Sequence, residues 1–285
     1  MGDRTASRYG DDPVLTRATR RAVVSVVGAV VLLVVGLSVA VSLVSFKFGT
    51  FAFKAVGATH GWILLLPLAI AVLWLTRAIR RATRGDRLGS DAHELDVDHP
   101  LRVSLARLAA LADVPVPPLR VVDSQRPNSY VVVEEDGTQT LCVTSSALEA
   151  CTQAELDAML AHELFHVAHG DARLTSRLEA MAELADTRVS VLSGWIVPAV
   201  RGLMRQRELS ADRAAALLTS RPSDLDSAVR TCTRAVHPGP PDLRLVTAVP
   251  FVEASSGERP GWCTHPSVDE RADSLARVAA QLGQR

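Results

Sequence analysis

The chain has 285 residues, of which 48% are hydrophobic and 22% are charged, and its 31 basic residues balance its 31 acidic residues. This composition excludes a disordered polar protein, and zero net charge gives no support for electrostatic binding of nucleic acid. Because a charge-free run near the start precedes a mixed remainder, we expect a membrane anchor followed by one soluble domain. The four cysteines lack CxxC spacing and the density of a disulfide scaffold, so we interpret them as reduced thiols in a cytosolic setting.

Two apolar segments near the N-terminus are predicted to cross a membrane. Residues 22–46 contain no charged side chain, and about 20 apolar residues suffice for a transmembrane helix. This run is too long for the apolar part of a signal peptide. Residues 55–76 form a second run, in which His60 is the only titratable group and Pro67 is a breaker that membrane helices tolerate. The sequence therefore predicts a transmembrane hairpin after a tail of residues 1–21.

The distribution of cations predicts the orientation of this hairpin. Five arginines precede the first span, five follow the second, and only Lys47 and Lys54 lie between them. The arginines are Arg4, Arg8, Arg17, Arg20 and Arg21 before the hairpin and Arg77, Arg80, Arg81, Arg84 and Arg87 after it. Since positive charge near membrane spans stays on the cytoplasmic side, we expect both ends of the hairpin in the cytoplasm. The lipid bilayer, expected to be the cell (inner) membrane, is thus a predicted partner, and the soluble domain is predicted to be cytoplasmic.

A polar linker and a helix are expected after the hairpin. Residues 77–100 combine charged side chains with glycine and serine, which is typical of a linker. Leucines recur at spacings of three and four from Leu101 to Leu111, which predicts a helix, and Pro115 marks its end. The soluble domain is therefore expected to span residues 101–285.

Three short runs rich in β-forming residues follow, at residues 119–122, 130–133 and 141–144. Asp136 and Gly137 form a hairpin signal between the last two runs. The rest of the chain has helical patterning, apart from a loop rich in proline and glycine expected from residue 237 to residue 262. The predicted fold class is α+β, with a mainly helical soluble domain and a small β-sheet.

The strongest helix signal lies over residues 153–169. Thr152 and Glu155 form a capping-box pattern at its start, and Gly170 is a typical helix stop. This helix carries His162 and His166, which are four residues apart and can direct their imidazoles at one metal ion. With Glu163 between them, they form the HExxH zinc motif. Glu163 cannot ligate the same ion, but it is placed to hold a water molecule.

A zinc ion in such a site needs a third protein ligand and leaves one position for water. The candidates are Glu179, Glu183 and Glu208. Glu208 and Asp212 share one helix face, so Glu208 could ligate the metal while Asp212 accepts a hydrogen bond from a ligand histidine. Spacing alone favours Glu208 only modestly over Glu183.

The sequence resembles the membrane zinc metalloproteases of the HtpX type, which are gluzincin-type enzymes and relatives of the CAAX prenyl proteases. The resemblance runs from about residue 101 to residue 282 and includes several motifs in order. They are Asn128-Ser129-Tyr130 where the family tends to have Asn-Ala-Phe or Asn-Ala-Tyr, the run from Glu155 through His162-Glu163-Leu164-Phe165-His166, Gly170-Asp171, Glu208-Leu209-Ser210-Ala211-Asp212-Arg213, Thr264-His265-Pro266-Ser267 and Glu270-Arg271. The resemblance implies that Glu208 is the third zinc ligand.

One feature departs from the family pattern. Only 41 residues separate His166 from Glu208, which is too few for the second hydrophobic hairpin associated with HtpX-type proteins. The most apolar piece between them, residues 189–204, contains Pro198 and Arg201 and is expected to form a core or interfacial helix. The sequence therefore indicates a relative with two membrane spans.

Three further residues are candidates for contact with a substrate. The resemblance implies that His265 lies near the metal, where it could hydrogen-bond the oxyanion of a tetrahedral intermediate, although a histidine before Pro266 can also be a simple turn residue. Asn128 could orient a substrate or act only as a turn former. From Tyr130 to residue 133 the chain could offer an open strand edge to an extended peptide.

The expected function is zinc-dependent hydrolysis of peptide bonds, with Glu163 as the general base. Placement beside a membrane hairpin indicates protein substrates from the membrane, as in quality control. Processing of a lipidated C-terminus is an alternative that rests on kinship alone. A membrane sensor or scaffold that binds zinc without general proteolysis is the alternative from another class, but a purely structural zinc site does not need Glu163.

Overall fold

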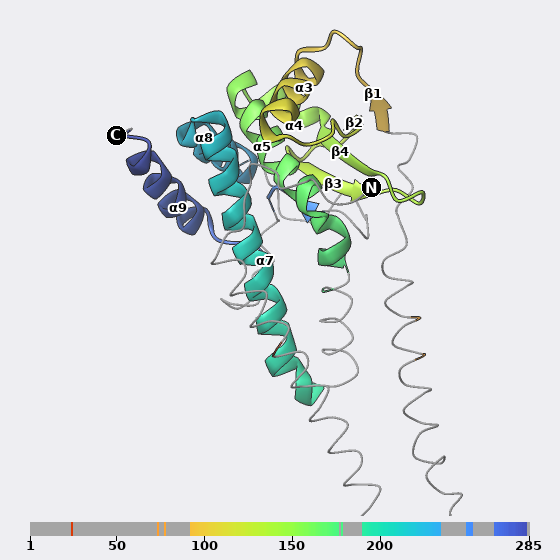
Figure 1. Ribbon diagram of the computed structural model, residues 1–285, viewed down its shortest axis with the longest axis vertical. Coiled ribbons are helices and arrows are strands. Elements are labelled where there is room, and N and C mark those ends of the chain that lie inside the picture. Colours follow the sequence, from red (N-terminus) through yellow and green to blue (C-terminus); the bar gives the residue numbers. More distant parts are fainter. Residues whose placement is uncertain are drawn as a thin grey trace, which may run out of the picture.

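The computed structural model describes the part of the chain that follows the two apolar segments, in which helices pack against one side of a small sheet (Figure 1). Apart from a few isolated positions, the described residues are 92–176, 190–234, 249–252 and 265–283. The α+β class predicted for this part is confirmed. The two predicted membrane spans lie outside the described residues, except for one position in each. Among the helices that the structure describes, none combines the length and the apolar character that crossing a membrane requires.

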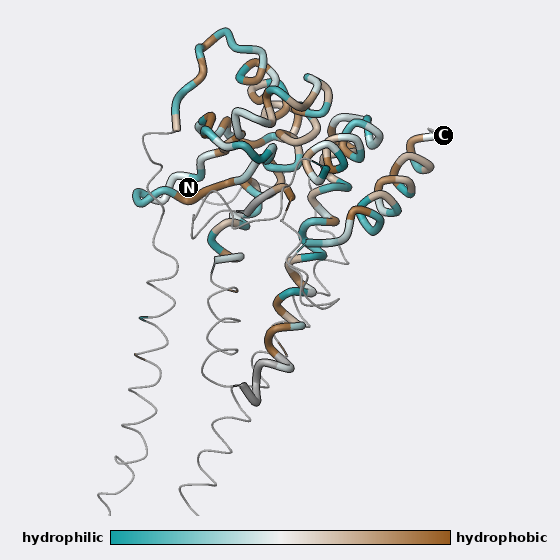
Figure 2. Tube along the Cα trace, turned by 180° about the vertical axis from the view of Figure 1, so that it is seen from behind, coloured by the Kyte–Doolittle hydropathy of each residue, from teal (hydrophilic) through white to brown (hydrophobic). Residues whose placement is uncertain are grey.

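A mixed sheet of five strands forms one side of the domain, in the order β1-β2-β4-β3-β5. The strands are β1 (Ala92–Glu94), β2 (Leu119–Val122), β3 (Ser129–Val133), β4 (Gln139–Thr144) and β5 (Val249–Pro250). β2 and β4 are parallel, whereas the other three pairs are antiparallel. β3 and β4 form the predicted hairpin, whose turn contains Gly137 at a φ of +90°, a backbone conformation that side chains disfavour. Figure 2 shows the hydrophobic β3 leading into this hydrophilic turn.

Two expectations for the sheet were wrong. β1 lies inside the segment expected to be only a linker, and β5 lies inside the expected loop from residue 237 to residue 262. Strands of two or three residues are too short to show the alternating pattern of a strand, and they form here because neighbouring backbone groups need hydrogen-bond partners. As a consequence, the edge of β3 is not fully open, because β5 pairs with Tyr130 and Val131.

The helix α3 (Pro100–Ala112) packs against α5 and confirms the leucine pattern with one exception. Leu101, Leu105 and Leu108 are buried, but Leu111 is 40% exposed near the C-terminal end of the helix. His99 caps the N-terminus by accepting a hydrogen bond from the backbone N–H of Leu101. A short helix α4 (Ser145–Ala150) follows β4 directly.

The helix α5 (Gln153–His169) has the predicted bounds. Thr152 and Glu155 form the capping box, since each side chain accepts a hydrogen bond from the backbone N–H of the other. Gly170 ends the helix at a φ of +63°, which a glycine adopts without strain. The Glu155 carboxylate also accepts hydrogen bonds from Ser227 and Thr231. The start of α5 is therefore hydrogen-bonded to the helix of residues 222–234.

Three helices complete the domain, namely α7 (Ser190–Thr219), α8 (Pro222–Arg234) and α9 (Val268–Gln281). The helix expected over residues 189–204 is the first half of α7, which continues past Pro198 and buries Val200 and Leu203. α9 begins after Ser267, which forms a second capping box with Glu270. Figure 2 shows hydrophobic and hydrophilic residues alternating along α9, the pattern of a helix with one buried face.

The principal core joins the helices to the sheet. Its buried side chains come from α3, α4, α5, α7, α8 and α9, from β2 and β4, and from Phe251 and Val252 after β5, and they include Leu105, Leu141, Leu160, Leu225 and Leu275. α5 therefore lies at the centre of the domain, with the sheet on one side and α7 and α8 on the other (Figure 1).

We expect replacement of Thr152 with alanine to destabilise the protein by about 1 kcal/mol, because an N-cap side chain satisfies a backbone donor at the helix start. Thr152→Ser is the matched control, since serine keeps the capping hydroxyl. The measurement is the free energy of unfolding from urea denaturation of both variants. Equal stability of the alanine and serine variants would show that the cap does not stabilise α5.

Candidate metal centre

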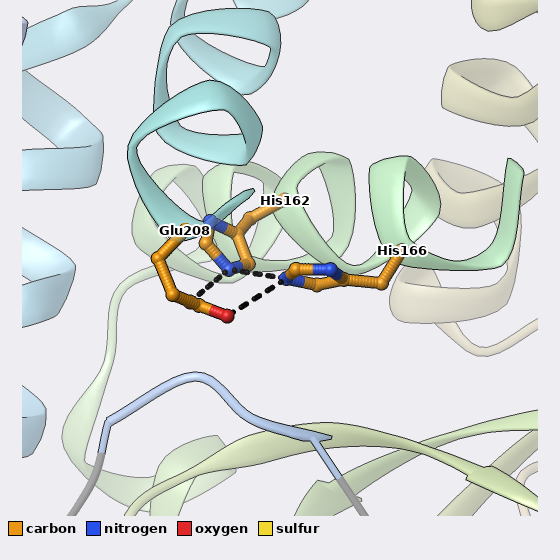
Figure 3. A group of neighbouring side chains, drawn as sticks. All are labelled: His162, His166 and Glu208. Atoms are coloured by element: carbon orange, nitrogen blue, oxygen red, sulfur yellow. Dashed lines mark hydrogen bonds and ion pairs between the residues drawn. The ribbon is translucent and has the colours of Figure 1, made fainter. Parts of the chain in front are cut away.

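Three buried side chains converge between α5 and α7, as Figure 3 shows. His162 and His166 come from α5 and Glu208 comes from α7, and the potential ligand atoms all lie within 4.8 Å of one another. The Nε2 atoms of the two histidines are 3.1 Å apart. The Glu208 carboxylate oxygens lie 3.3 Å from Nε2 of His162 and 3.5 Å from Nε2 of His166. A tetrahedral zinc ion holds two nitrogen ligands about 3.3–3.4 Å apart, so the spacing fits such an ion.

The outer nitrogens of both histidines face carboxylates. Nδ1 of His162 lies 3.0 Å from Asp212, and Nδ1 of His166 lies 2.9 Å from Asp171. An ionised carboxylate can only accept, so each Nδ1 carries the hydrogen and each neutral imidazole presents a bare lone pair at Nε2. Two lone pairs and a carboxylate facing one another in a buried space require a cation between them.

Arginines hold both of these aspartates. Arg271 donates to Asp212 from Nε at 2.8 Å and from an Nη atom at 2.6 Å, and it is itself buried on α9. Arg207 on α7 forms an ion pair with Asp171. Each ligand histidine is therefore oriented by an aspartate whose charge an arginine compensates, which keeps the buried carboxylates ionised.

The pKa values describe a centre that attracts positive charge. Burial acts to lower the pKa of His162, but hydrogen bonds to Asp212 and Glu208 outweigh it and raise the pKa to about 9. Burial lowers the pKa of His166 to about 4. Although burial alone would raise it, the nearby histidines, His265 foremost, hold the pKa of Glu208 well below its ordinary value. The raised pKa of His162 and the lowered pKa of Glu208 both mean that this buried centre favours positive charge.

Glu163 lies beside the centre and is fully buried. One of its oxygens accepts a hydrogen bond of 2.7 Å from the hydroxyl of Ser129 on β3. The other, Oε2, has no hydrogen-bond partner within the described part of the chain. Burial raises the pKa of this carboxyl above its ordinary value. The side chain thus offers one anchored oxygen and one oxygen available to a water molecule.

The structure brings His265 and Asn128 to the same region. Nε2 of His265 lies 3.6 Å from a carboxylate oxygen of Glu208. Asn128 precedes β3, and its side-chain amide binds the backbone of Val252. Tyr130 belongs to the same strand, but its side chain is buried with Val122, Val132 and Cys142 in a separate cluster, so that only its backbone lies along the edge of β3.

The rival ligands Glu179 and Glu183 lie outside the described residues. No role was predicted for Asp171, Arg271 and Ser129, although all three belong to the motifs that carry the family resemblance. Arg207 lies outside those motifs, and a single sequence offers no signal for its ion pair. Cys142, Cys151 and Cys232 are free and buried.

Two histidines and a glutamate on packed helices, with a second glutamate next to the first histidine, define the class of metal-dependent peptidases of the HExxH type. The sequence profile described as Peptidase family M48 matches residues 97–279, which is most of the chain. The chain belongs to this family, as one of its HtpX-type members. Membership implies a metalloprotease.

Relatives carry the same family name. The chain is 35% identical to Protease HtpX homolog 1 of Streptomyces coelicolor over 213 residues, which cover 62% of this chain and 70% of that protein. It is 30% identical to Protease HtpX homolog 2 of Methanosarcina mazei, over 62% of this chain and 72% of that protein. Identity to Protease HtpX homolog of Salinibacter ruber is 27%, but the match covers 80% of this chain and 92% of the relative.

Replacement of Asp171 with asparagine is expected to weaken zinc binding about 10–100-fold. Without the carboxylate, neither the orientation of the His166 ring nor the hydrogen on its Nδ1 is fixed. Asp273→Asn on the exposed side of α9 is the matched control, with the same chemical change far from the centre. Competition with a chelating dye measures the affinity of both purified variants. Equal affinities would mean that Asp171 does not orient the histidine.

Proposed function

We propose that this protein is a zinc-dependent endopeptidase with His162, His166 and Glu208 as its metal ligands. The observation that carries the proposal is the buried convergence of three ligand atoms, two of them bare imidazole nitrogens, next to a glutamate that does not ligate. Two nitrogens and one carboxylate oxygen are the ligand set of catalytic zinc sites that keep one position for water. Asp212 and Asp171 orient the histidines from the outer side.

Zinc in this centre would supply an activated water and a polarised scissile carbonyl. Glu163 is the general base that takes the proton from that water and delivers it to the leaving amine. Its raised pKa suits both steps, because a carboxylate that is too acidic accepts a proton poorly. Ser129 holds Oε1 of Glu163 by a hydrogen bond, so Oε2 is the oxygen that would accept and deliver the proton.

His265 and Asn128 would act on the substrate. A ring nitrogen of His265 beside Glu208 is within reach of the carbonyl oxygen under attack, where an N–H donor stabilises the developing negative charge. Asn128 carries both a donor and an acceptor at the edge of β3, which matches the N–H and C=O of one residue of a peptide. The backbone of Tyr130 would continue the same edge, so the substrate is an extended protein segment.

We further propose that the substrates are membrane proteins and that the enzyme serves their quality control at the cytoplasmic face of the cell membrane. The two apolar segments at residues 22–46 and 55–76 support a membrane anchor, and the arginines on both sides of them support a cytoplasmic protease domain. Relatives that are named HtpX proteases support a role in proteolysis.

We expect Glu163→Gln to retain zinc and the fold but to lose turnover about 10²–10⁴-fold, because glutamine cannot accept the proton. Glu208→Ala should instead lose zinc as well as activity. Zinc content by metal analysis and cleavage of an unfolded protein by the detergent-solubilised enzyme distinguish the two variants. Full activity of Glu163→Gln would exclude the proposed mechanism, and a wild-type protein that binds zinc but cleaves nothing would favour the sensor alternative.

The proposed topology predicts opposite labelling of two introduced cysteines. In a Cys263→Ser background, a cysteine in place of Gly49 should react with a membrane-impermeant maleimide in intact cells, because the loop between the spans is outside. A cysteine in place of Ser90 should react only after permeabilisation. The described native cysteines are buried and give a low background. The reverse pattern would put the protease domain outside the cytoplasm.

A further inference from the structure

A short segment of the chain, residues 249–252, lies along the outer edge of β3 next to the metal centre. β5 pairs antiparallel with β3, with Pro250 opposite Tyr130 and Val249 opposite Val131. The N–H of Phe251 then donates a hydrogen bond of 2.7 Å to the carbonyl oxygen of Ser129. Figure 3 shows this segment, in blue, passing below the labelled side chains. The segment thus occupies the strand edge at which an extended peptide would be held.

The side-chain amide of Asn128 makes two hydrogen bonds to the backbone of this segment. Its Nδ2 donates to the carbonyl oxygen of Val252 at 2.8 Å, and its Oδ1 accepts from the N–H of the same residue at 3.1 Å. Both contacts involve only main-chain atoms of Val252, so the same amide could hold any extended peptide. The residue proposed to bind substrate therefore binds the chain itself.

The side chain of Phe251 lies beside the metal ligands. Its ring is fully buried and meets the ring of His162 edge-on, with 4.9 Å between the centroids. Arg271 donates to the carbonyl oxygen of Phe251 at 2.7 Å. The carbonyl oxygen of Ser129 accepts the N–H of Phe251, and the hydroxyl of the same serine donates a hydrogen bond to Glu163. Ser129 therefore connects the backbone of the segment to the proposed general base.

We propose that residues 249–252 are an internal competitor for the substrate. The substrate binds by displacing them, and it carries a bulky apolar residue in the place of Phe251. This inference rests on the proposed function, since it assigns the occupant of the same groove. Among the described residues, this segment is held on the strand edge by β5 pairing with Tyr130 and Val131, by one backbone bond to Ser129 and by the Asn128 amide, and an extended peptide can make these same backbone contacts in its place. The protease is then partly autoinhibited, and access depends on release of its own strand.

The first test removes one contact of the segment. Val252→Pro eliminates the N–H that Asn128 accepts, whereas Val252→Ala shortens the same side chain and keeps this N–H. We expect the proline variant to raise kcat/KM for an unfolded protein substrate at least fivefold over the alanine variant, with equal zinc content. An equal or lower kcat/KM in a folded, zinc-loaded proline variant would overturn the proposal.

The second test needs neither turnover nor a variant in the segment. Zinc-loaded Glu163→Gln protein is mixed with a synthetic peptide of residues 246–255 of this chain, and hydrogen exchange is followed at the amides of Phe251 and Val252. We expect exchange at both amides to become at least tenfold faster at saturating peptide, and a control peptide with Phe251→Asp to bind at least tenfold more weakly. Unchanged exchange, or equal binding of the two peptides, would overturn the proposal.

The two tests separate this inference from the proposed function. If the wild-type enzyme cleaves protein but the exchange at Phe251 does not respond to peptide, the chain is a protease without an internal competitor. If no form cleaves protein while the parent peptide still displaces the segment, hydrolysis fails as the function and the groove remains a peptide-binding site that its own strand fills.

Discussion

The structure depends on a charge imbalance at its centre. Two imidazole lone pairs and a carboxylate face one another in a space without solvent, and such an arrangement is stable only around a cation. The imidazoles point inward because Asp212 and Asp171 fix their outer nitrogens. Those aspartates remain ionised because Arg271 and Arg207 lie against them. A bound metal would therefore complete a network that extends over α5, α7 and α9. The affinity for the metal would then depend on how these helices pack.

This network accounts for the arrangement of the helices around α5. α7 contributes three residues to it. Glu208 faces Nε2 of both histidines, Arg207 pairs with Asp171 on the outer side of His166, and Asp212 meets Nδ1 of His162. Small residues on both helices, such as the buried Ala161 and Ala211, allow the two backbones to come close. α9 is fixed through Arg271, which contacts Asp212 and the ring of Phe251. The C-terminal helix thus supports the centre without supplying a ligand.

Local signals predicted the helices of the fold better than its short strands. The bounds of α5 followed from Thr152 and Gly170, because a cap and a left-handed stop depend only on residues adjacent in sequence. α9 begins with a signal of the same kind, a capping box between Ser267 and Glu270. β1 and β5 were not predicted, since two or three residues carry no periodicity and both strands exist only through pairing with distant partners. Leu111 fits the spacing of three and four but is exposed, because at about 100° per residue it lies outside the face of α3 that buries Leu108 and Ala112.

The HExxH motif was readable without a structure, because its spacing puts His162, Glu163 and His166 on one turn of one helix. Spacing favoured Glu208 as the third candidate ligand only modestly and the family resemblance decided for it, since 41 intervening residues say nothing about separation in space. Only the tertiary structure brought Glu208 to the histidines, paired Asp171 with His166, and laid residues 249–252 along the edge of β3. These contacts join segments far apart in sequence, and they form because buried charges and strand edges must find partners wherever the packed core presents them.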